Sequence, residues 1–239
     1  MNLDVLPVRH GSAAENMAID FLLLQRRPAA AAVRFRHYEW RKPAFTFGYS
    51  QKIALVRAKL PEGAERFDLC RRPTGGGLVD HRDDWTYSLV IPRGHPLEEQ
   101  RATLSYRAIH EALAAALRAQ GVEAITKPAP DPAAEPPAGL EGVCFQRAEL
   151  YDVVQGRSGE KIAGAAQKRN KHGLLFQGSI WRPATGGTID WEKFAAEFVD
   201  RLAVMLSVTA GPTPWPEFNE DEVEGLTERY ASPEWNEQR

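Results

Sequence analysis

Three consecutive glycines lie between two segments that resemble β-strands, and no other feature restricts the fold of this chain as strongly. Gly75, Gly76 and Gly77 belong to the stretch RRPTGGGLVDH, with apolar FDLC before it and WTYSLVIP after it. Glycine loses more backbone freedom on folding than any other residue and adds no side chain to the core, so such a run is costly in a sheet. The glycines therefore indicate either a bulge or tight turn, or bare backbone that a ligand or a neighbouring segment approaches closely.

Phosphate-binding loops do not explain this glycine run. A P-loop has a lysine directly after its last glycine, and a dinucleotide-binding loop opens a helix with G-x-G-x-x-G. Here Leu78 and a strand-like segment follow. If the glycines form the floor of a ligand site, Arg71 or Arg72 can meet an anionic group. His81, four residues beyond the glycines, is either an acid or base, or a partner in a structural hydrogen bond.

The composition limits the class of protein. The chain has 239 residues, 43% hydrophobic and 26% charged, enough for one large or two small domains with a real core. Its formal net charge of −2 gives no general attraction to nucleic acid or membranes, and neither a membrane-spanning run nor a signal peptide is visible. Two cysteines, Cys70 and Cys144, exclude a disulfide scaffold and a zinc ribbon and indicate the reducing cytoplasm.

Hydrophobic periodicity predicts helices and strands without regular alternation. Helices are expected over 13–27, 96–120, 190–206 and 219–231, and strands over 32–40, 44–50, 148–156, 160–168 and 173–181. The second helix begins with acidic residues and stops at Gly121, and its apolar stripe consists of Leu104, Ile109, Leu113 and Leu117. This mixture favours a mixed sheet flanked by helices over a parallel barrel.

Residues 127–142, KPAPDPAAEPPAGLEG, contain five prolines and predict a long surface loop, since neither a helix nor a central strand tolerates them. Loops of this length are often functional, and this one leads directly to Cys144. Free cysteines are usually inert core residues, and Cys70 in its apolar segment fits that interpretation. Cys144 becomes a candidate nucleophile if a nearby cation favours its thiolate.

Lys161 offers such a cation. It opens the segment KIAGAAQK, whose small residues let another body come close. A lysine here either points to solvent from an edge strand or, placed in a cleft, neutralises a developing oxyanion or a phosphate. The sheet can bring the thiol of Cys144 and the ammonium of Lys161 together. The histidines form no H-E-x-x-H pair, and we predict no metal site.

Several motifs together resemble the biotin/lipoate protein ligase superfamily. RRPTGGGLVDH resembles its R-R-x-[ST]-G-G-x-x-V-x-H signature, and GEKIAGAAQKR followed by LLFQGSI resembles its G-[RK]-K-[IF]-[AS]-G-x-A-Q-x-R and H-G-[ST]-[IL] segments. AAENMAIDFLLL and RYASPEWNEQR resemble the first helix and the closing segment of the family. The resemblance implies an α+β fold with a mixed, largely antiparallel sheet flanked by helices, like class II aminoacyl-tRNA synthetases and biotin synthetases. It also implies one catalytic domain over residues 1–239, without a C-terminal accessory domain.

Two reactions compete within this superfamily. Cysteine-dependent octanoyltransferases move an octanoyl group to a lysine of a lipoyl domain, and ATP-dependent lipoate–protein ligases first form lipoyl-adenylate. VCFQRAELYDVV resembles the C-F-x-x-x-x-x-Y-[ED] strand of the transferases and TYSLVIP their T-Y-S-x-x-x-P. Gly77 is instead similar to the ligases, because such transferases often have arginine there. Gln177 departs from both groups, which usually have histidine before Gly178.

The resemblance assigns roles to individual residues. It implies that Cys144 attacks the octanoyl thioester, and that Lys161 lowers the pKa of the thiol and then holds the acyl carbonyl oxygen. The implied substrate-binding residues are Arg71, Arg72, Thr74, Gly75, Gly76, Gly77, His81, Ala163, Gly164, Gln177 and Gly178. In the ligase alternative, Lys161 and the glycines hold an acyl-adenylate and Cys144 is incidental.

The resemblance also implies cofactors and partners. Octanoyl (or lipoyl) transfer needs no ATP, because an amide is more stable than a thioester, whereas the ligase alternative needs ATP and Mg. The implied donor is acyl carrier protein, and the implied acceptors are lipoyl domains of dehydrogenase E2 subunits or the glycine-cleavage H protein. We expect no nucleic-acid or membrane partner, and a monomer in the cytoplasm. A third hypothesis, from another class, is a non-catalytic acyl-binding module.

Overall fold

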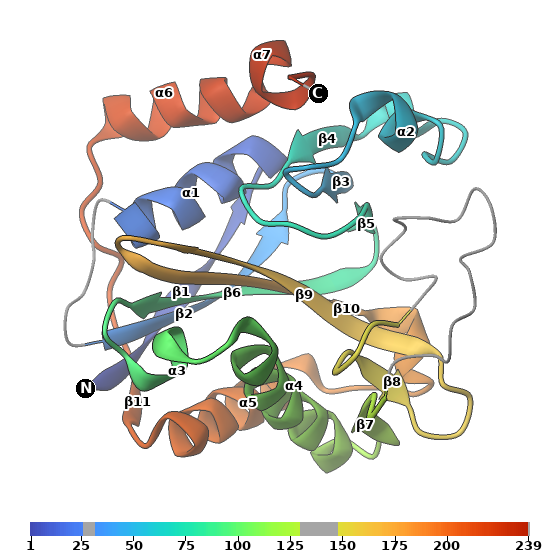
Figure 1. Cartoon of the computed structure of the whole chain (residues 1–239), viewed down its shortest axis with the longest axis vertical. Helices are drawn as coiled ribbons and strands as arrows, with labels where there is room; N and C mark the ends of the chain where they lie inside the picture. The colour runs from blue at the N-terminus through green and yellow to red at the C-terminus, as the bar shows by residue number, and fades with distance from the viewer. Residues whose placement is uncertain (26–31, 130–147, 239) are drawn as a thin grey trace.

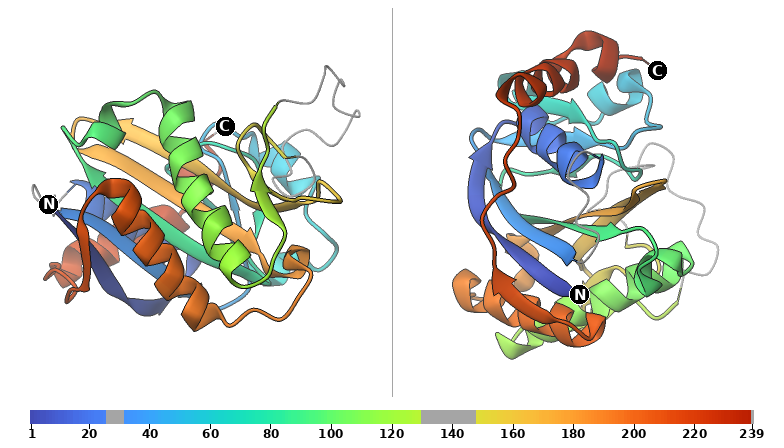
Figure 2. Two further views of the ribbon diagram at one scale, coloured as in Figure 1. Left: turned by 90° about the horizontal axis from the view of Figure 1, so that it is seen from below. Right: turned by 90° about the vertical axis from the view of Figure 1, so that its left-hand side faces the viewer.

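A large mixed sheet forms the middle of the molecule, with helices on both faces (Figure 1). The structure, a computed structural model, describes residues 1–25, 32–129 and 148–238. The helices that cover the two faces are α1 (Ala13–Gln25) and α6 (Glu220–Ala231) on one side, and α4 (Ala102–Ala119) and α5 (Trp191–Leu206) on the other. Figure 2 shows the same two layers from further directions, with α4 and α5 lying across the sheet.

The large sheet has eight strands in the order β11-β1-β2-β6-β10-β9-β8-β7. Their bounds are β1 Asn2–Gly11, β2 Ala32–Trp40, β6 Asp84–Pro92, β7 Ala124–Thr126, β8 Val153–Gln155, β9 Lys161–Asn170, β10 Gly173–Trp181 and β11 Thr209–Pro212. β1 pairs in parallel with β2 and with β11, and every other neighbouring pair is antiparallel. This sheet confirms the predicted fold class.

A second, three-stranded sheet lies above the α1 face of the large one. Its order is β4-β3-β5, with β3 Ala44–Phe47, β4 Asp68–Arg71 and β5 Val79–Asp80. The glycine run connects β4 to β5 within this small sheet, and the chain then enters the large sheet as β6. The two strand-like flanks of the glycines are therefore real strands, but they belong to different sheets.

Alternation along the central strands builds two separate cores, because successive side chains of a strand point to opposite faces. On β6, Leu89 faces α4 and α5 and Val90 faces α1; on β10, Phe176 and Leu175 divide in the same way. The first core is rich in aromatic side chains, such as Phe198 of α5. The sheet face toward α1 is only partly covered by that helix, and the uncovered part leaves room for a binding site.

Capping residues begin the helices where the sequence predicts. At α1, the backbone N–H of Glu15 donates to Ser12 Oγ at 3.2 Å and the N–H of Ser12 donates to Glu15 Oε2 at 3.4 Å, a reciprocal pair that satisfies two helix-end donors. Asp190 accepts from the N–H of Lys193 at the start of α5. Asn219 accepts from the N–H of Glu222 at the start of α6.

The helix expected over 96–120 is wrong in one respect, because the structure divides it into α3 (Pro96–Glu99) and α4. Gln100, between the two helices, has an extended backbone. The guanidinium of Arg169, on β9, donates to the carbonyls of Glu98 at 3.0 Å and Gln100 at 3.2 Å, which satisfies acceptors that α3 leaves unpaired at its end. The proposed apolar stripe also loses Leu104, whose side chain is exposed, while its other three members are buried.

Some elements escape the sequence analysis. These elements are β1, β5, β7, β11, α2 (Ile53–Arg57) and α7 (Pro233–Asn236). The strand expected over 148–156 shrinks to β8, because the chain turns at Tyr151, which has a left-handed φ of 67°. Most of the proline-rich stretch lies outside the described residues. None of the helices that the structure describes is long and apolar enough to cross a membrane.

Candidate active site

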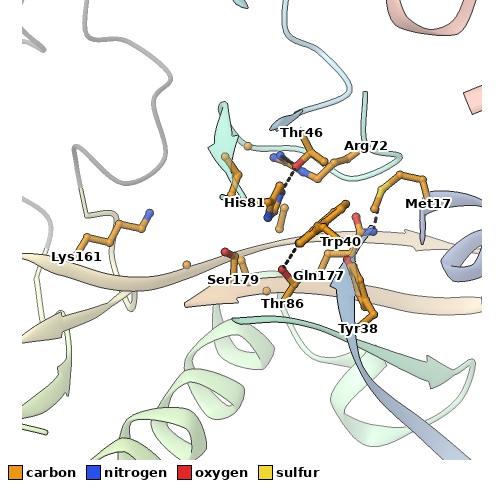
Figure 3. Close-up of a pocket in the computed structure, with 16 residues that line it drawn as sticks. Met17, Tyr38, Trp40, Thr46, Arg72, His81, Thr86, Lys161, Gln177 and Ser179 are labelled. Atoms are coloured by element: carbon orange, nitrogen blue, oxygen red, sulfur yellow. Dashed lines mark hydrogen bonds between the residues drawn. The ribbon is translucent and has the colours of Figure 1, made fainter. Parts of the chain in front are cut away.

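A cavity opens on the α1 face of the large sheet, below the small sheet, and Lys161 lies at one end of it (Figure 3). This Lys161 cavity encloses about 500 Å³, including the space at its mouth, and its surface is mainly apolar. Its lining residues are Met17, Tyr38, Trp40, Thr46, Arg72, Gly76, Val79, His81, Thr86, Lys161, Gly164, Ala165, Ala166, Gln177, Gly178 and Ser179. Such a chamber, apolar with a few polar groups at fixed places, is typical of small-molecule sites.

An ion pair fixes the ammonium of Lys161. Its Nζ lies 2.6 Å from Asp152 Oδ2, and the two side chains are 6% and 0% exposed. Tyr106 donates its hydroxyl hydrogen to Asp152 Oδ1 and accepts a hydrogen bond from the N–H of Ala165 at 3.0 Å. Burial, together with the Asp152 carboxylate, raises the pKa of the Tyr106 phenol. Lys161 is thus a buried, oriented cation rather than a solvent-facing lysine of an edge strand.

Gly164 leaves the room in which Lys161 lies. A Cβ at position 164 would sit 2.7 Å from Lys161 Cε, 2.8 Å from Lys161 Nζ and 3.2 Å from Asp152 Oδ1. Gly164 pairs with Ser179 of β10, so it faces the cavity in the middle of the sheet. The small residues of this segment let the lysine fold back along its own strand.

His81 belongs to a buried network on the side of the small sheet. Its Nε2 lies 2.7 Å from Thr46 Oγ1 and its Nδ1 lies 2.7 Å from Asp84 Oδ2. Asp84 Oδ2 also accepts hydrogen bonds from Thr86 and Ser179, each at 2.6 Å. Burial opposes the ionisation of Asp84, but the imidazole and these two hydroxyls outweigh it and lower the pKa of the carboxyl group. Because both ring nitrogens are engaged, the geometry favours the structural hydrogen bond of the two alternatives for His81.

Arg72 shapes the glycine loop from inside. Its Nη1 donates to Thr46 Oγ1 at 2.9 Å, and its Nη2 donates to the carbonyls of Gly75 at 2.8 Å and Gly77 at 2.9 Å. Arg72 lines the cavity and is buried, so its guanidinium holds the loop at the cavity wall, and its contact with an anionic group stays a prediction. Charge-assisted hydrogen bonds of this kind stiffen the backbone they bind.

The structure shows that the glycine run is both a tight turn and bare backbone that a neighbouring segment approaches. A Cβ on Gly48 would lie only 2.0 Å from the carbonyl oxygen of Gly76, so a neighbouring segment does approach bare backbone. Gly76 has a left-handed φ of 87°, which favours glycine, and it lines the cavity. The loop is therefore both a tight turn and part of a cavity wall. Gly75 and Gly77 do not line that wall.

Arg71 lies outside the cavity. It is fully buried, and its guanidinium donates to backbone carbonyls of Tyr49, Gln51, Trp235 and Asn236 at 2.7 to 3.1 Å. These bonds fasten α7 and the turn after β3 to the edge of β4. The expectation that Arg71 meets a substrate anion finds no support in this geometry, because those donors are committed to the fold.

Of the remaining predicted site residues, some line the cavity, one supports a lining residue, one packs in the opposite core, and one lies outside the described residues. Gln177 and Gly178 line the cavity, and Thr74 supports it by donating a hydrogen bond to Gln177. Ala163 packs in the core on the opposite face. Cys144 lies outside the described residues. Cys70 is buried, and that burial raises the pKa of its thiol to about 12, as an inert core cysteine requires.

Several polar residues of the site are not predicted from the sequence, among them Asp152, Asp84 and Tyr106. Asp152 occupies the acidic position of the Y-[ED] pattern, a signal that could have identified it. Asp84 and Tyr106 give no such signal, since only the folded sheet brings them to His81 and Asp152. Within the described ranges, no three His, Cys, Asp or Glu side chains gather to hold a metal ion, and the metal-free and ATP-free site stays a prediction.

Solved structures with the same architecture define the class of fold. A T. acidophilum protein with bound lipoic acid has a TM-score of 0.76 at 19% identity, over 100% of both chains. Lipoate-protein ligase A bound with ATP has a TM-score of 0.73 at 19% identity, over 99% of both chains. At such identities the likeness shows the fold alone, which is that of the lipoate–protein ligases.

Sequence relatives narrow this class to a family. The model of the lipoyl protein ligase A/B catalytic domain matches residues 12–182. Octanoyltransferase LipM of Bacillus cereus is 34% identical over 177 residues, which cover 71% of this chain but 61% of that protein. Octanoyltransferase LipM of Symbiobacterium thermophilum is 28% identical over 272 residues, with 98% of both covered. The chain belongs to the lipoyl protein ligase A/B catalytic domain family, and the predicted resemblance is confirmed.

Proposed function

We propose that the protein is an acyltransferase of protein lipoylation, which moves an octanoyl (or lipoyl) group from acyl carrier protein through a thioester on Cys144 to a lysine of a lipoyl domain. The observation that carries the proposal is a buried ammonium, that of Lys161, fixed by Asp152 at one end of an apolar cavity. The names of the LipM relatives support the octanoyl group.

Each residue then has a defined task. The thiolate of Cys144 attacks the carbonyl carbon of the donor thioester, a bond to the carrier sulfur breaks, and the carrier leaves as a thiolate. The amine of the acceptor lysine next attacks the Cys144 thioester, which forms an amide and returns the sulfur to the enzyme. The Cys144 thiolate released in this step takes up the proton that the amine loses. No step consumes ATP, because the amide is more stable than the thioester.

Lys161 supports both steps electrostatically. A free thiol with a pKa of about 8.5 is only a few per cent ionised near neutrality, and a neighbouring cation lowers that pKa. The same ammonium then stabilises the oxyanion that develops on the acyl carbonyl. Asp152 and Tyr106 hold it in place before substrate arrives, so little reorganisation accompanies the reaction.

The apolar cavity provides binding energy for the acyl chain. Each buried methylene contributes about 0.8 kcal/mol, so the roughly seven of an octanoyl chain contribute about 5 kcal/mol before ordering costs. Trp40, Met17 and Val79 offer apolar surface for them. The polar side chains of Arg72, His81 and Gln177 on this wall are hydrogen-bonded within the protein, which keeps the chamber suitable for a hydrocarbon.

Mass spectrometry of an acyl-enzyme tests the proposal. Incubation with octanoyl-carrier protein, without ATP, should add one octanoyl mass to Cys144 and none to Cys144→Ala. Cys70→Ala is the matched control and should label normally, because Cys70 is sealed in the core. Lys161→Met should slow the labelling and move its pH profile upward, since the thiol loses its neighbouring cation.

The alternatives predict other outcomes. The ligase hypothesis, which Gly77 favours, predicts ATP-dependent labelling of a lipoyl domain with free lipoate that Cys144→Ala leaves unaffected. A non-catalytic acyl-binding module predicts no labelling under either condition. Either result would exclude the thioester route.

A further inference from the structure

A second cavity lies beyond the far end of the Lys161 cavity. It encloses about 670 Å³, including the space at its mouth, and we call it the Trp235 cavity after one of its lining residues. Three elements line both cavities in turn: α1 with Met17 and Phe21, β10 with Gln177 and Leu175, and β9 with Ala166 and Lys168. Residues four apart on a helix and two apart on a strand share a face, so the two cavities follow one another along the same surface.

Gln177 stands between them. Figure 3 shows Gln177 and Met17 at the end of the Lys161 cavity that lies away from Lys161. The next residue of β10 on the same face is Leu175, about 7 Å further along the strand, and it already lines the Trp235 cavity. On the side of the glycine loop the change occurs between Gly76, in the first cavity, and Pro73, in the second.

The amide of Gln177 is fastened across this boundary. Its Oε1 accepts a hydrogen bond from Thr74 Oγ1 at 2.7 Å, and its Nε2 donates to Asp20 Oδ2 at 2.7 Å and contacts Met17 Sδ at 3.3 Å. Asp20 is itself anchored, since its Oδ1 accepts from Ser88 at 2.7 Å. With both ends of the amide engaged and the residue buried, the side chain cannot rotate away without breaking buried hydrogen bonds.

The Trp235 cavity is chemically able to receive a hydrocarbon tail. Leucines and aromatic rings form most of its wall. Its two cations lie over rings, with Lys168 Nζ 5.3 Å from the centroid of Tyr49 and Arg229 Cζ 5.4 Å from that of Trp235. The space behind Gln177 is more polar than the Lys161 cavity, but its leucines and rings give a hydrocarbon tail apolar surface to lie against.

We propose that the Thr74–Gln177–Asp20 bridge is the end wall of the acyl site, and that Gln177 is the residue that sets the longest acyl chain this protein accepts. This inference rests on the proposed function, because it takes the carboxyl-derived head of the acyl group to lie at Lys161 and the methyl end to point toward Gln177. Shortening Gln177 joins the two cavities, so that chains of ten to fourteen carbons extend beneath Phe21 and Leu175.

Binding of free fatty acids of eight, ten, twelve and fourteen carbons, measured by calorimetry, tests the wall directly and without catalysis. The wild-type protein should bind dodecanoate at least about tenfold more weakly than octanoate, and Gln177→Ala should remove most of that difference. Thr74→Ala, which takes away one support of the amide, should shift the limit in the same direction by less. Leu175→Ala is the matched control, because it enlarges only the cavity behind the wall and should keep the wild-type limit.

The outcomes separate this inference from the proposed function. Octanoate binding with the same length limit in the wild type, Gln177→Ala and Thr74→Ala, while circular dichroism shows folded protein, overturns the wall and leaves acyl transfer untouched. A wild-type protein that binds all four lengths equally also overturns it. If no fatty acid binds to any variant and no acyl-enzyme forms on Cys144, both the wall and the proposed function fail.

Discussion

At the scale of single residues, the Lys161 ammonium occupies its position because Gly164 has no Cβ. The Nζ lies 2.8 Å from the position that a Cβ at residue 164 would take, and Asp152 holds it there from the neighbouring turn. The lysine is thus oriented by a carboxylate on one side and by the bare α-carbon of Gly164 on the other. Such double support is what a pre-organised electrostatic site requires.

Gly164→Ala should therefore slow acyl-enzyme formation without unfolding the protein. The new Cβ would lie within 3 Å of the last two atoms of Lys161, and the flexible end of the lysine can move at a cost of about 1 kcal/mol. We expect acyl-enzyme formation to slow at least about tenfold, which corresponds to roughly 1.4 kcal/mol. Rapid-quench mass spectrometry gives the rate, and urea unfolding gives the stability.

A double-mutant cycle provides the control for this substitution. If the clash with Lys161 is the cause, Gly164→Ala should cost less stability in a Lys161→Ala background than in the wild type, because the two residues are in contact. Additive costs would show that alanine at 164 disturbs the strand itself, and would contradict the account given for Lys161.

The sequence indicates the cation at this site but not its partner. Lys161 is recognisable because it opens a segment of small residues. Asp152 lies nine residues earlier in the chain, and its place beside the lysine follows from the turn at Tyr151 and the pairing of β8 with β9. A side-chain contact made through strand register cannot be read from residue spacing alone.

At the scale of elements, the glycine loop and β3 pack backbone against backbone. Arg72 hydrogen-bonds to the carbonyls of the loop. The carbonyl oxygen of Gly76 lies so close to Gly48, just after β3, that a Cβ there would be only 2.0 Å away. This contact sets where the glycine loop, whose Gly76 lines the Lys161 cavity, lies against the end of β3. A side chain at the contact would have to push two segments of main chain apart.

Gly48→Ala and Gly75→Ala should consequently differ strongly. The Cβ at 48 would meet backbone at 2.0 Å, whereas a Cβ at 75 would meet nothing within 4 Å. We expect Gly48→Ala to lower the free energy of unfolding by about 3 kcal/mol, and Gly75→Ala to change it by no more than about 0.5 kcal/mol. Equal losses in urea unfolding would show that the loop moves freely on β3.

The sequence predicts those elements whose boundaries are set by neighbouring residues, such as helix caps. Helices α1, α5 and α6 begin directly after Ser12, Asp190 and Asn219, each of which caps its own helix. β1 is missed because Pro7 interrupts it, and the pairing of β1 with β2 shifts register there. The division between α3 and α4 depends on Arg169, about seventy residues further along the chain, and no local pattern contains that information.

At the scale of the whole molecule, His110 of α4 connects the aromatic core to the site. Its Nδ1 donates to the carbonyl of Tyr151 at 2.7 Å, next to Asp152, and its Nε2 has no hydrogen-bond partner among the described residues. Rings of Tyr106 and Phe176 enclose it. Burial outweighs the opposing effects of the Asp152 charge and the Tyr151 carbonyl and, with a smaller contribution from the charge of Lys161, lowers the pKa of His110 from 6.5 to about 4. The folded protein therefore keeps this imidazole neutral.

The sign of the resulting pH dependence follows from the direction of that shift. The pKa of His110 is lower in the folded state than in the unfolded chain, so between pH 6.5 and about 4 the unfolded state binds the extra proton. The stabilisation is fully present above pH 6.5 and is lost as the pH falls toward 4. Burial also lowers the pKa values of His37 and His95. The stabilisation from Asp84, whose pKa is lowered, is present above the usual pKa of a carboxyl group and is lost below it.

Comparing the wild type with His110→Asn isolates the contribution of His110, because asparagine keeps a donor for the carbonyl of Tyr151 and does not titrate. The stability difference between the two proteins should be constant above pH 6.5 and should then change in favour of the variant by up to about 3 kcal/mol as the pH approaches 4. Urea unfolding at half-unit pH steps measures it. A difference that stays constant over this range would mean that the core admits the charged imidazole, and that His110 does not join acid stability to the Lys161 site.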